Sequence, residues 1–316
     1  MAVRSPTQSP AVDWLLASEE PAVRFLTRRG ILGERVEADA DELLSGRWVR
    51  ALLSGQQAGG GFGDHPYRKW TGAHWRLVSL VELAVPPGEP RAVAAAEHVL
   101  DWLTGPEHRR RLEPVNGLVR RHASIEGNAL AACSRLGLAR DERVELLARS
   151  LVEWQWPDGG WNCDRGATGR RSSFHESLPP MWGLHEYAEA TGAEWAREAA
   201  HRTAELLLEH RVFRSLATGE VIHERWLAFR YPPYWHYDVL QALLILSRLG
   251  LAGDPRAAEA VELVEERRLP DGRWKADGCW WRSAGSRLYP DVVAWGRSGP
   301  NPMVTLNALR VLGAAR

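Results

Sequence analysis

Three turns along the chain share one residue spacing. QWPDGGW at 155–161 reads Gln-x-x-x-Gly-x-Trp, QQAGGGF at 56–62 ends in phenylalanine instead, and RLPDGRW at 268–274 begins with arginine instead. Weaker turn signals, NGLV at 116–119 and TGEVI at 218–222, lie between them. The glycines of these five turns recur at intervals of about 42 to 60 residues, and a period of this size predicts a repeated supersecondary unit.

Helix-periodic stretches flank these turns. The stretches before two of the turns, 141–155 and 254–268, mix apolar and charged residues and are expected to be amphipathic helices with one face in solvent. The stretches after the turns are more apolar and are expected to be buried helices: 72–84, 124–138, 182–190, 237–250 and 301–315. No stretch alternates strictly between apolar and polar residues, so strands are not expected.

Alternating exposed and buried helices predict an all-α protein built as a double ring. Five to six helix-turn-helix repeats would place the buried helices around a central axis and the amphipathic ones outside them. An open solenoid is the alternative that the same period allows. We expect residues 13–30 to supply the first helical segment, residues 1–12 to be a flexible N-terminus, and 13–316 to form one α/α-toroid domain.

Composition narrows the class of protein. Forty basic and forty acidic residues cancel, which argues against a nucleic acid partner. No apolar run is long enough to span a bilayer, the N-terminus lacks a signal-peptide core, and three cysteines are too few for a disulfide framework. We therefore expect a cytoplasmic protein. Sixteen tryptophans, against eleven tyrosines and phenylalanines, indicate an architecture with many deep apolar slots.

The Gln-x-x-x-Gly-x-Trp frame resembles the QW repeat of squalene–hopene cyclases and other class II terpene cyclases. Their α/α toroid is shared with the β subunits of protein prenyltransferases. The resemblance implies that Gln155 and Trp161 join outer helices and are not catalytic. It also implies a substrate that is an isoprenoid or another apolar small molecule. The length of the chain implies one barrel, whereas full squalene cyclases have two.

In barrels of this family the inner helices begin at the opening of the axial cavity, so the resemblance places candidate site residues there. Four of the five predicted inner helices begin near a histidine, which is not a favoured N-cap residue. The predicted catalytic residues are Asp238, His236, Glu176 and His175. The predicted substrate-binding residues are His74, Trp75, His122, Glu126, Trp235, Tyr237 and Thr305.

Asp238 is the principal candidate acid. In class II cyclases an Asp-x-Asp-Asp motif opens an inner helix, and Asp238 matches its last position, whereas Trp235 and Tyr237 stand at the other acidic positions. The chain contains neither Asp-x-Asp-Asp nor the Asp-Asp-x-x-Asp of ionising cyclases. Two prolines at 232–233 stop a helix from entering this segment, so we expect the inner helix to begin near Trp235.

No metal or other cofactor is expected. The Asp-x-Cys of the prenyltransferase zinc site has a local counterpart in Asp277-Gly-Cys279, but no histidine follows residue 236. Cys163 and Asp164 could combine with His175 and His236, yet neither set has the short fixed spacing of a zinc motif.

Three functions remain open. The first is a terpene-cyclase-like enzyme, a cyclase or isomerase that uses acid–base chemistry in a central aromatic cavity. The second is an acid–base hydrolase or lyase of the (α/α)6 type on a polar substrate, and the third is a non-catalytic barrel that binds a small molecule. Cavity character separates them, because aromatic walls favour the first and converging charged groups favour the second. The sequence leaves the oligomeric state open.

Overall fold

The computed structural model describes residues 9–110, 114–166, 168–280, 291–296 and 299–316. Within these ranges the secondary structure is helical, apart from three isolated β-bridges. The α-helices are α1 (Pro10–Leu16), α2 (Pro21–Gly30), α3 (Ala40–Ser45), α4 (Arg47–Leu53), α5 (Ala73–Glu82), α6 (Pro90–Thr104), α7 (Ala123–Arg135), α8 (Glu142–Trp154), α9 (Phe174–Thr191), α10 (Glu194–Glu209), α11 (Val239–Arg248), α12 (Ala258–Glu266) and α13 (Pro302–Ala314). Two 3-10 turns, η1 (Glu224–Leu227) and η2 (Pro255–Ala257), complete the set.

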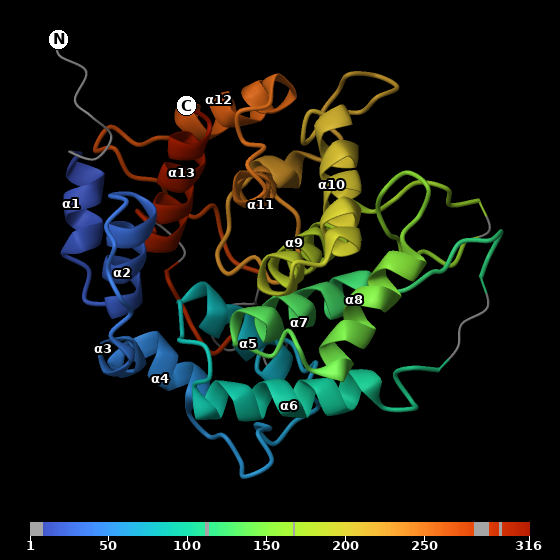
Figure 1. The fold of residues 1–316 in the computed structure, drawn as a ribbon. Coiled ribbons are helices and arrows are strands. Elements are labelled where there is room, and N and C mark those ends of the chain that lie inside the picture. Colours follow the sequence, from blue (N-terminus) through green and yellow to red (C-terminus); the bar gives the residue numbers. More distant parts are fainter. Residues whose placement is uncertain (1–8, 111–113, 167, 281–290, 297–298) are drawn as a thin grey trace.

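The helices form a double ring, which confirms the predicted all-α toroid. The inner helices are α2, α5, α7, α9, α11 and α13, and the outer ones are α1, α4, α6, α8, α10 and α12 (Figure 1). Each outer helix precedes its inner partner in the chain, giving six pairs among the described residues. Successive inner helices contact each other from α5 to α13, and α2, which packs against α13, returns through α3 and α4 to α5.

Three predicted boundaries differ from the structure. The expected first segment, 13–30, is two helices, because Pro21 starts a new helix after the Ser18–Glu20 turn. Helix α1 begins at Pro10, so residues 10–12 are helical, whereas residues 1–8 of the expected flexible N-terminus lie outside the described part. The inner helix expected at 182–190 begins eight residues earlier, at Phe174.

The early start of α9 carries Pro179 and Pro180 inside a helix. Each proline removes a backbone donor and crowds the preceding turn, so such a helix needs support from its neighbours. Helix α7 supplies it by close contact: a Cβ on Gly127 would lie 2.3 Å from the backbone nitrogen of Pro180, and a Cβ on Gly183 would lie 2.4 Å from the Gly127 carbonyl oxygen. Two glycines therefore let α7 and α9 approach backbone to backbone.

The turn at 155–161 joins helices α8 and α10. The Gln155 side-chain amide donates to the carbonyl of Gly159 in its own turn and to the carbonyl of Ala199 in α10, both at 2.9 Å. The Trp161 indole N–H donates to the Leu151 carbonyl in α8 at 2.9 Å, and its ring is buried. Gly159 has φ +91°, and a Cβ there would lie 2.4 Å from a carbonyl oxygen of α10. Gln155 and Trp161 therefore hold α8 and α10 together, as expected for residues with a structural role.

The two partial copies of the turn repeat the geometry as far as their residues allow. Gln56 donates to the carbonyls of Gly60 and of Arg91 in the next outer helix, α6. In the third copy the Trp274 indole N–H donates to the Val264 carbonyl in α12 at 2.7 Å, and the Arg268 guanidinium lies over the Trp274 ring. Each copy therefore ties an outer helix to a neighbouring segment of the chain.

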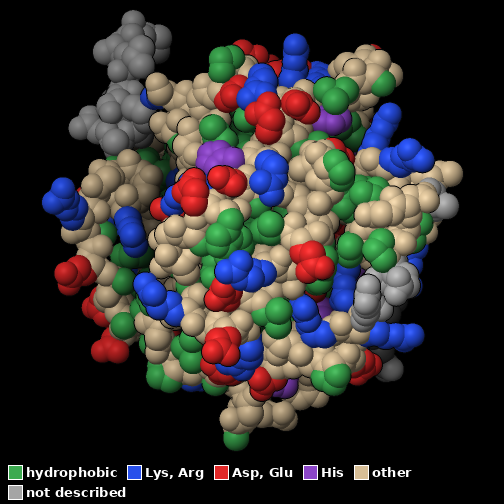
Figure 2. Space-filling model, turned by 45° about the vertical axis from the view of Figure 1, so that its right-hand side comes forward, with side chains coloured by type: hydrophobic (Ala, Val, Ile, Leu, Met, Phe, Trp, Pro, Cys, Tyr) green, Lys and Arg blue, Asp and Glu red, His purple; other side chains and the backbone are tan. Residues whose placement is uncertain are grey.

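No helix among the described residues is both long and apolar enough to cross a membrane. On the face drawn in Figure 2, basic and acidic side chains are interspersed over the surface.

Candidate functional site

Four predicted histidines lie at one end of the ring, where the inner helices begin. His74 and His175 are each the second residue of their helices, α5 and α9, and His122 is the N-cap of α7. Ring contacts run without a break from His175 to His74, in the order His175, His236, Trp70, Trp75 and His74.

The axis at this end is filled by aromatic side chains. The His236 ring lies between Trp235 and Trp280, with ring centroids 4.1 Å and 3.6 Å away. Trp70 stacks on Tyr234 at 4.2 Å. The cavity that His236 lines on the axis has only about 40 Å³, room for no more than a few water molecules. The described residues therefore do not enclose the expected substrate-sized aromatic cavity on the axis, because the aromatic side chains occupy that space themselves.

Asp238 is the N-cap of α11, which begins at Val239 and not near Trp235 as expected. The reason is local: Tyr234 adopts φ +54°, and the segment through His236 turns before the helix starts. Asp238 Oδ1 accepts the Gln241 N–H at 2.9 Å, whereas Oδ2 is buried and accepts no hydrogen bond of normal geometry from another described residue. Burial raises the pKa of the Asp238 carboxyl to about 7. Asp238 lines none of the described hollows.

The raised pKa of Asp238 makes stability depend on pH. The folded state binds a proton that the unfolded state, with a pKa near 3.8, releases, so this contribution to stability is complete below pH 3.8 and is lost as pH rises through about 7. We expect Asp238→Asn, which keeps a capping oxygen, to be more stable than the wild type at pH 8 by on the order of 1 kcal/mol or more, with the difference vanishing near pH 4. Urea unfolding at both pH values measures this. Equal stability at pH 8 would contradict it.

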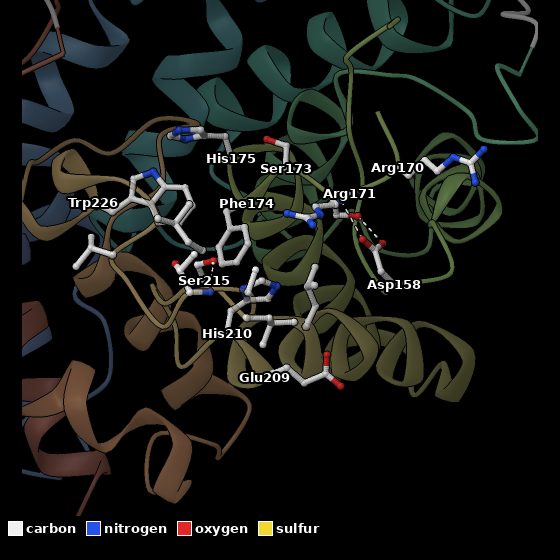
Figure 3. A pocket seen from close by; sticks show the side chains of 17 residues that line it. Asp158, Arg170, Arg171, Ser173, Phe174, His175, Glu209, His210, Ser215 and Trp226 are labelled. Carbon is white, nitrogen blue, oxygen red and sulfur yellow. Dashed lines mark hydrogen bonds between the residues drawn. The ribbon is translucent and has the colours of Figure 1, made fainter. Parts of the chain in front are cut away.

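His175 is a neutral imidazole held in one tautomer. Its Nδ1 accepts the Tyr237 N–H at 2.8 Å, so the ring proton is on Nε2. Burial lowers the pKa of His175 to about 4. His175 lies at the edge of a hollow of about 850 Å³ between the start of α9, the end of α10 and residues 215–226 (Figure 3).

This hollow has an apolar floor and a polar rim. Phe174 stacks on Trp226 at 4.8 Å and contacts the His210 ring edge-on at 5.2 Å. On the rim Asp158 is already bonded to Ser172, through both the backbone N–H and the hydroxyl (Figure 3). The hollow can hold an apolar group, but its titratable side chains do not converge on one point.

His122 and Glu176 form a hydrogen-bonded pair between α7 and α9. His122 Nδ1 lies 3.1 Å from Glu176 Oε1, and Glu176 Oε2 accepts the Ser124 N–H at 3.0 Å. The carboxyl is buried, whereas 67% of the His122 side chain is exposed. Burial alone would raise the pKa of Glu176, but the hydrogen bonds from His122 and Ser124 lower it below its ordinary value. The neighbouring Cys163 and Glu176 raise the pKa of His122 to about 10.

Cys163 completes a cluster with this pair. One ligand-type atom from each of His122, Cys163 and Glu176 lies within 4.8 Å of the other two. Such a set could hold a zinc ion, because thiolate, imidazole and carboxylate are all zinc ligands. The same three residues also match a catalytic triad, with Cys163 as the nucleophile, His122 as the base and Glu176 as the group that orients the base.

The cluster opens into a polar hollow of about 670 Å³. Glu126, a predicted binding residue, lies in its wall and bonds to His108 Nε2 at 2.9 Å. Other polar lining residues are His65, Glu107, Arg110, Arg120, Arg121, His122, Cys163 and Arg165. Arg120 and Arg121 also donate to carbonyls of the adjoining loops, so their positions are fixed.

The predicted residues therefore do not share one cavity. His122 and Glu126 line the polar hollow, His175 lines the apolar one, and His236 lines the axial cavity. His74 is buried, its two ring nitrogens have no hydrogen-bond partner among the described residues, and burial lowers its pKa to about 3.

Three other predicted binding residues are engaged in packing. The Trp75 indole N–H donates to the Tyr67 carbonyl at 3.0 Å, and the Thr305 hydroxyl bonds to the backbone of Trp274. The Tyr237 hydroxyl donates to the Val212 carbonyl at 2.5 Å. All three side chains are buried, and none lines a described hollow.

The chain is similar to solved structures at low sequence identity. No protein-family model matches the chain, and no curated protein matches it. Among solved structures, a protein from Actinoplanes is 16% identical, over 97% of this chain and 88% of that one, with a TM-score of 0.41. The type II terpene cyclase MstE from Scytonema, in its apo form, is 15% identical over 84% of this chain and 95% of that one, with a TM-score of 0.30. At TM-scores this low, neither similarity bears on what this chain does.

Proposed function

We propose that the protein is an acid–base enzyme, of the hydrolase or lyase type, that acts on a small polar molecule carrying negative charge. The observation that supports this proposal is the His122–Glu176 pair, with Cys163 beside it, at the wall of a hollow large enough for a small molecule. The second function left open by the sequence is thus the one that the geometry favours.

The two members of the pair have different tasks. Glu176 is buried and held by the Ser124 N–H, so its carboxylate orients the His122 ring and stabilises its protonated form. His122 is exposed to the hollow, and its raised pKa keeps it an imidazolium at neutral pH, which can donate a proton or a strong hydrogen bond to a substrate.

The charge of the hollow indicates the substrate class. Four arginines against two glutamates leave an excess of positive charge around the exposed His122 ring: Arg110, Arg120, Arg121 and Arg165 against Glu107 and Glu126. Arginine forks suit carboxylates and phosphates. A carboxylated or phosphorylated metabolite is therefore the substrate class that the hollow fits.

The test uses His122→Gln, with His201→Gln as its control. His201 is an exposed histidine of α10, outside the hollow. Wild-type protein is incubated with a mixture of carboxylated and phosphorylated metabolites, and consumption is followed by mass spectrometry. We expect a compound that the wild type and His201→Gln consume equally and His122→Gln consumes about 100-fold or more slowly. Equal turnover by both variants would rule out His122.

Asp238 supports a second candidate, the cyclase-like reaction on an apolar molecule. Burial raises the pKa of Asp238 to about 7, so part of the carboxyl is protonated at neutral pH, which is the state that an acid acting on an alkene needs. This function requires a substrate to reach Asp238, which lines none of the described hollows. If a terpenoid is turned over and Asp238→Asn abolishes the turnover while His122→Gln does not, this candidate replaces the first.

A further inference from the structure

A third large hollow lies at the opposite end of the ring, where the inner helices end. It has about 670 Å³ and is lined from α2, α5, α7, α9, α11 and α13. Its ionisable residues are Arg29, Glu82, Arg135, His185, Glu186, Arg248 and Arg310. Burial lowers the pKa of His185, so at neutral pH four arginines face two carboxylates.

Two of these arginines share one carboxylate. Glu82 is buried and accepts hydrogen bonds from Arg248 Nη2 at 2.9 Å and from Arg135 Nη1 at 3.3 Å. Arg248 Nη1 also lies 3.5 Å from Glu186 Oε1. The carboxylates of the hollow are thus already shared by Arg135 and Arg248.

Arg310 differs from these arginines. Its guanidinium donates no hydrogen bond to another described residue, although arginine has five N–H donors. It lies against the end of α2, where a Cβ on Gly30 would be 2.8 Å from Arg310 Nε. Burial and the nearby charges of Arg248 and Arg135 lower the pKa of Arg310 to about 10, although the charge of Glu82 opposes this shift.

The carbonyl ends of the inner helices offset part of this positive charge, because a helix C-terminus carries a partial negative charge. A purely structural arginine in that position would bond to those carbonyls, and Arg310 does not do so within the described residues. An arginine that is crowded by like charges and has free donors toward a hollow is suited to an anion that enters it.

We propose that this hollow binds an anionic group, a phosphate or a carboxylate, through Arg310 with the flanking Arg135 and Arg248. The axial cavity between the two ends has only about 40 Å³, so this site is separate from the His122–Glu176 hollow. The proposal therefore does not depend on the proposed function, and failure of one leaves the other standing.

The experiment is calorimetric titration of the full chain at low ionic strength with inorganic phosphate, pyrophosphate and acetate in separate arms. We expect saturable binding with a Kd below about 1 mM for at least one of them, with the arms distinguishing phosphate from carboxylate recognition. Arg310→Gln should weaken binding about tenfold or more, and Arg310→Lys, which keeps the charge without the fork, should weaken it partly.

Arg28→Gln is the matched control. Like Arg310→Gln, it removes one arginine charge. Arg28 precedes Arg29, a residue of the hollow, in helix α2, but Arg28 itself is exposed and bonds to Glu34 outside the hollow. We expect it to change Kd less than about twofold. In the absence of anion, Arg310→Gln should be no less stable than the wild type, since it removes a crowded charge. No saturable binding in any arm, or equal weakening by Arg28→Gln, would overturn the proposal.

Discussion

Glu176→Gln is expected to lower the pKa of His122 from about 10 toward its ordinary value of about 6.5, and to slow turnover about 100- to 10,000-fold. The carboxylate is one of the two groups that hold the imidazolium, and glutamine keeps its size without its charge. A ¹³C-resolved NMR titration of the histidine rings measures the pKa, with His122→Gln assigning the resonance. The pKa readout needs no substrate, so it tests the pair even before the reaction is known.

Glu126→Gln is the matched control for this substitution. Like Glu176, Glu126 is buried and bonded to a histidine, but its partner is His108; Glu126 lies in the wall of the hollow. It should leave the pKa of His122 within a few tenths of the wild-type value. If both variants shift the pKa of His122 equally, or neither does, Glu176 is not one of the groups that raise the pKa of His122.

The His122–Glu176 pair also makes the stability of the fold depend on pH. The pKa of His122 is higher in the folded than in the unfolded state, so its stabilising contribution is complete below about pH 6.5 and is lost as pH rises toward 10. Glu176→Gln should flatten the stability profile across this window. Asp238 contributes between about pH 4 and 7, below this window, so the two groups can be separated in one unfolding series.

The ring is predictable from the sequence because its repeat is local. Each turn needs a glycine with positive φ, and each helix shows its buried face in a few consecutive residues. The start of α9 is not predictable in this way, because no local pattern contains its cause. Two prolines are tolerated there because Gly127, some 50 residues earlier, lets α7 pack against them.

The candidate site is harder to predict because it depends on distances across the ring. The sequence places His122 and Glu176 at the starts of two inner helices, but only packing of α7 on α9 brings them within 3.1 Å. Cys163 lies in the loop before α9, where the sequence pattern suggests other partners for it, and His108 precedes α7 outside any motif. The one available signal is that Cys163 comes two residues after the repeat turn.

The sequence indicates the axial residues but not their role. Trp70, Trp235 and Trp280 supply the aromatic character that an apolar cavity needs, and in this structure they stack against neighbouring rings and close the axis. The composition gives the number of large aromatic side chains, but it does not tell whether they line a cavity or fill it. Cavity volume decides that question, and the axial cavity of about 40 Å³ shows that here the rings fill the space.

Trp161→Ala is expected to lower the free energy of unfolding by about 3–5 kcal/mol, the largest stability effect among these variants. The ring is 1% exposed and its indole N–H donates to the Leu151 carbonyl of α8, so truncation removes buried apolar surface and leaves a buried acceptor without its donor. Urea unfolding at pH 7 gives the number, and an unchanged melting temperature would count against the structural role of the turn.

Two companion variants separate the causes of that loss. Trp161→Phe keeps a large apolar ring without the donor, so it should lose less than Trp161→Ala. Trp195→Ala removes a partly exposed indole from α10 and should also lose less. Because Trp161 holds α8 through Leu151 while Gln155 reaches Ala199 in α10, the same truncation should loosen the contact between these two outer helices first. Hydrogen exchange should then speed up at the C-terminal end of α8 before it does so in α2, across the ring. Uniform acceleration over all helices would mean that the turn stabilises the domain as a whole rather than this joint.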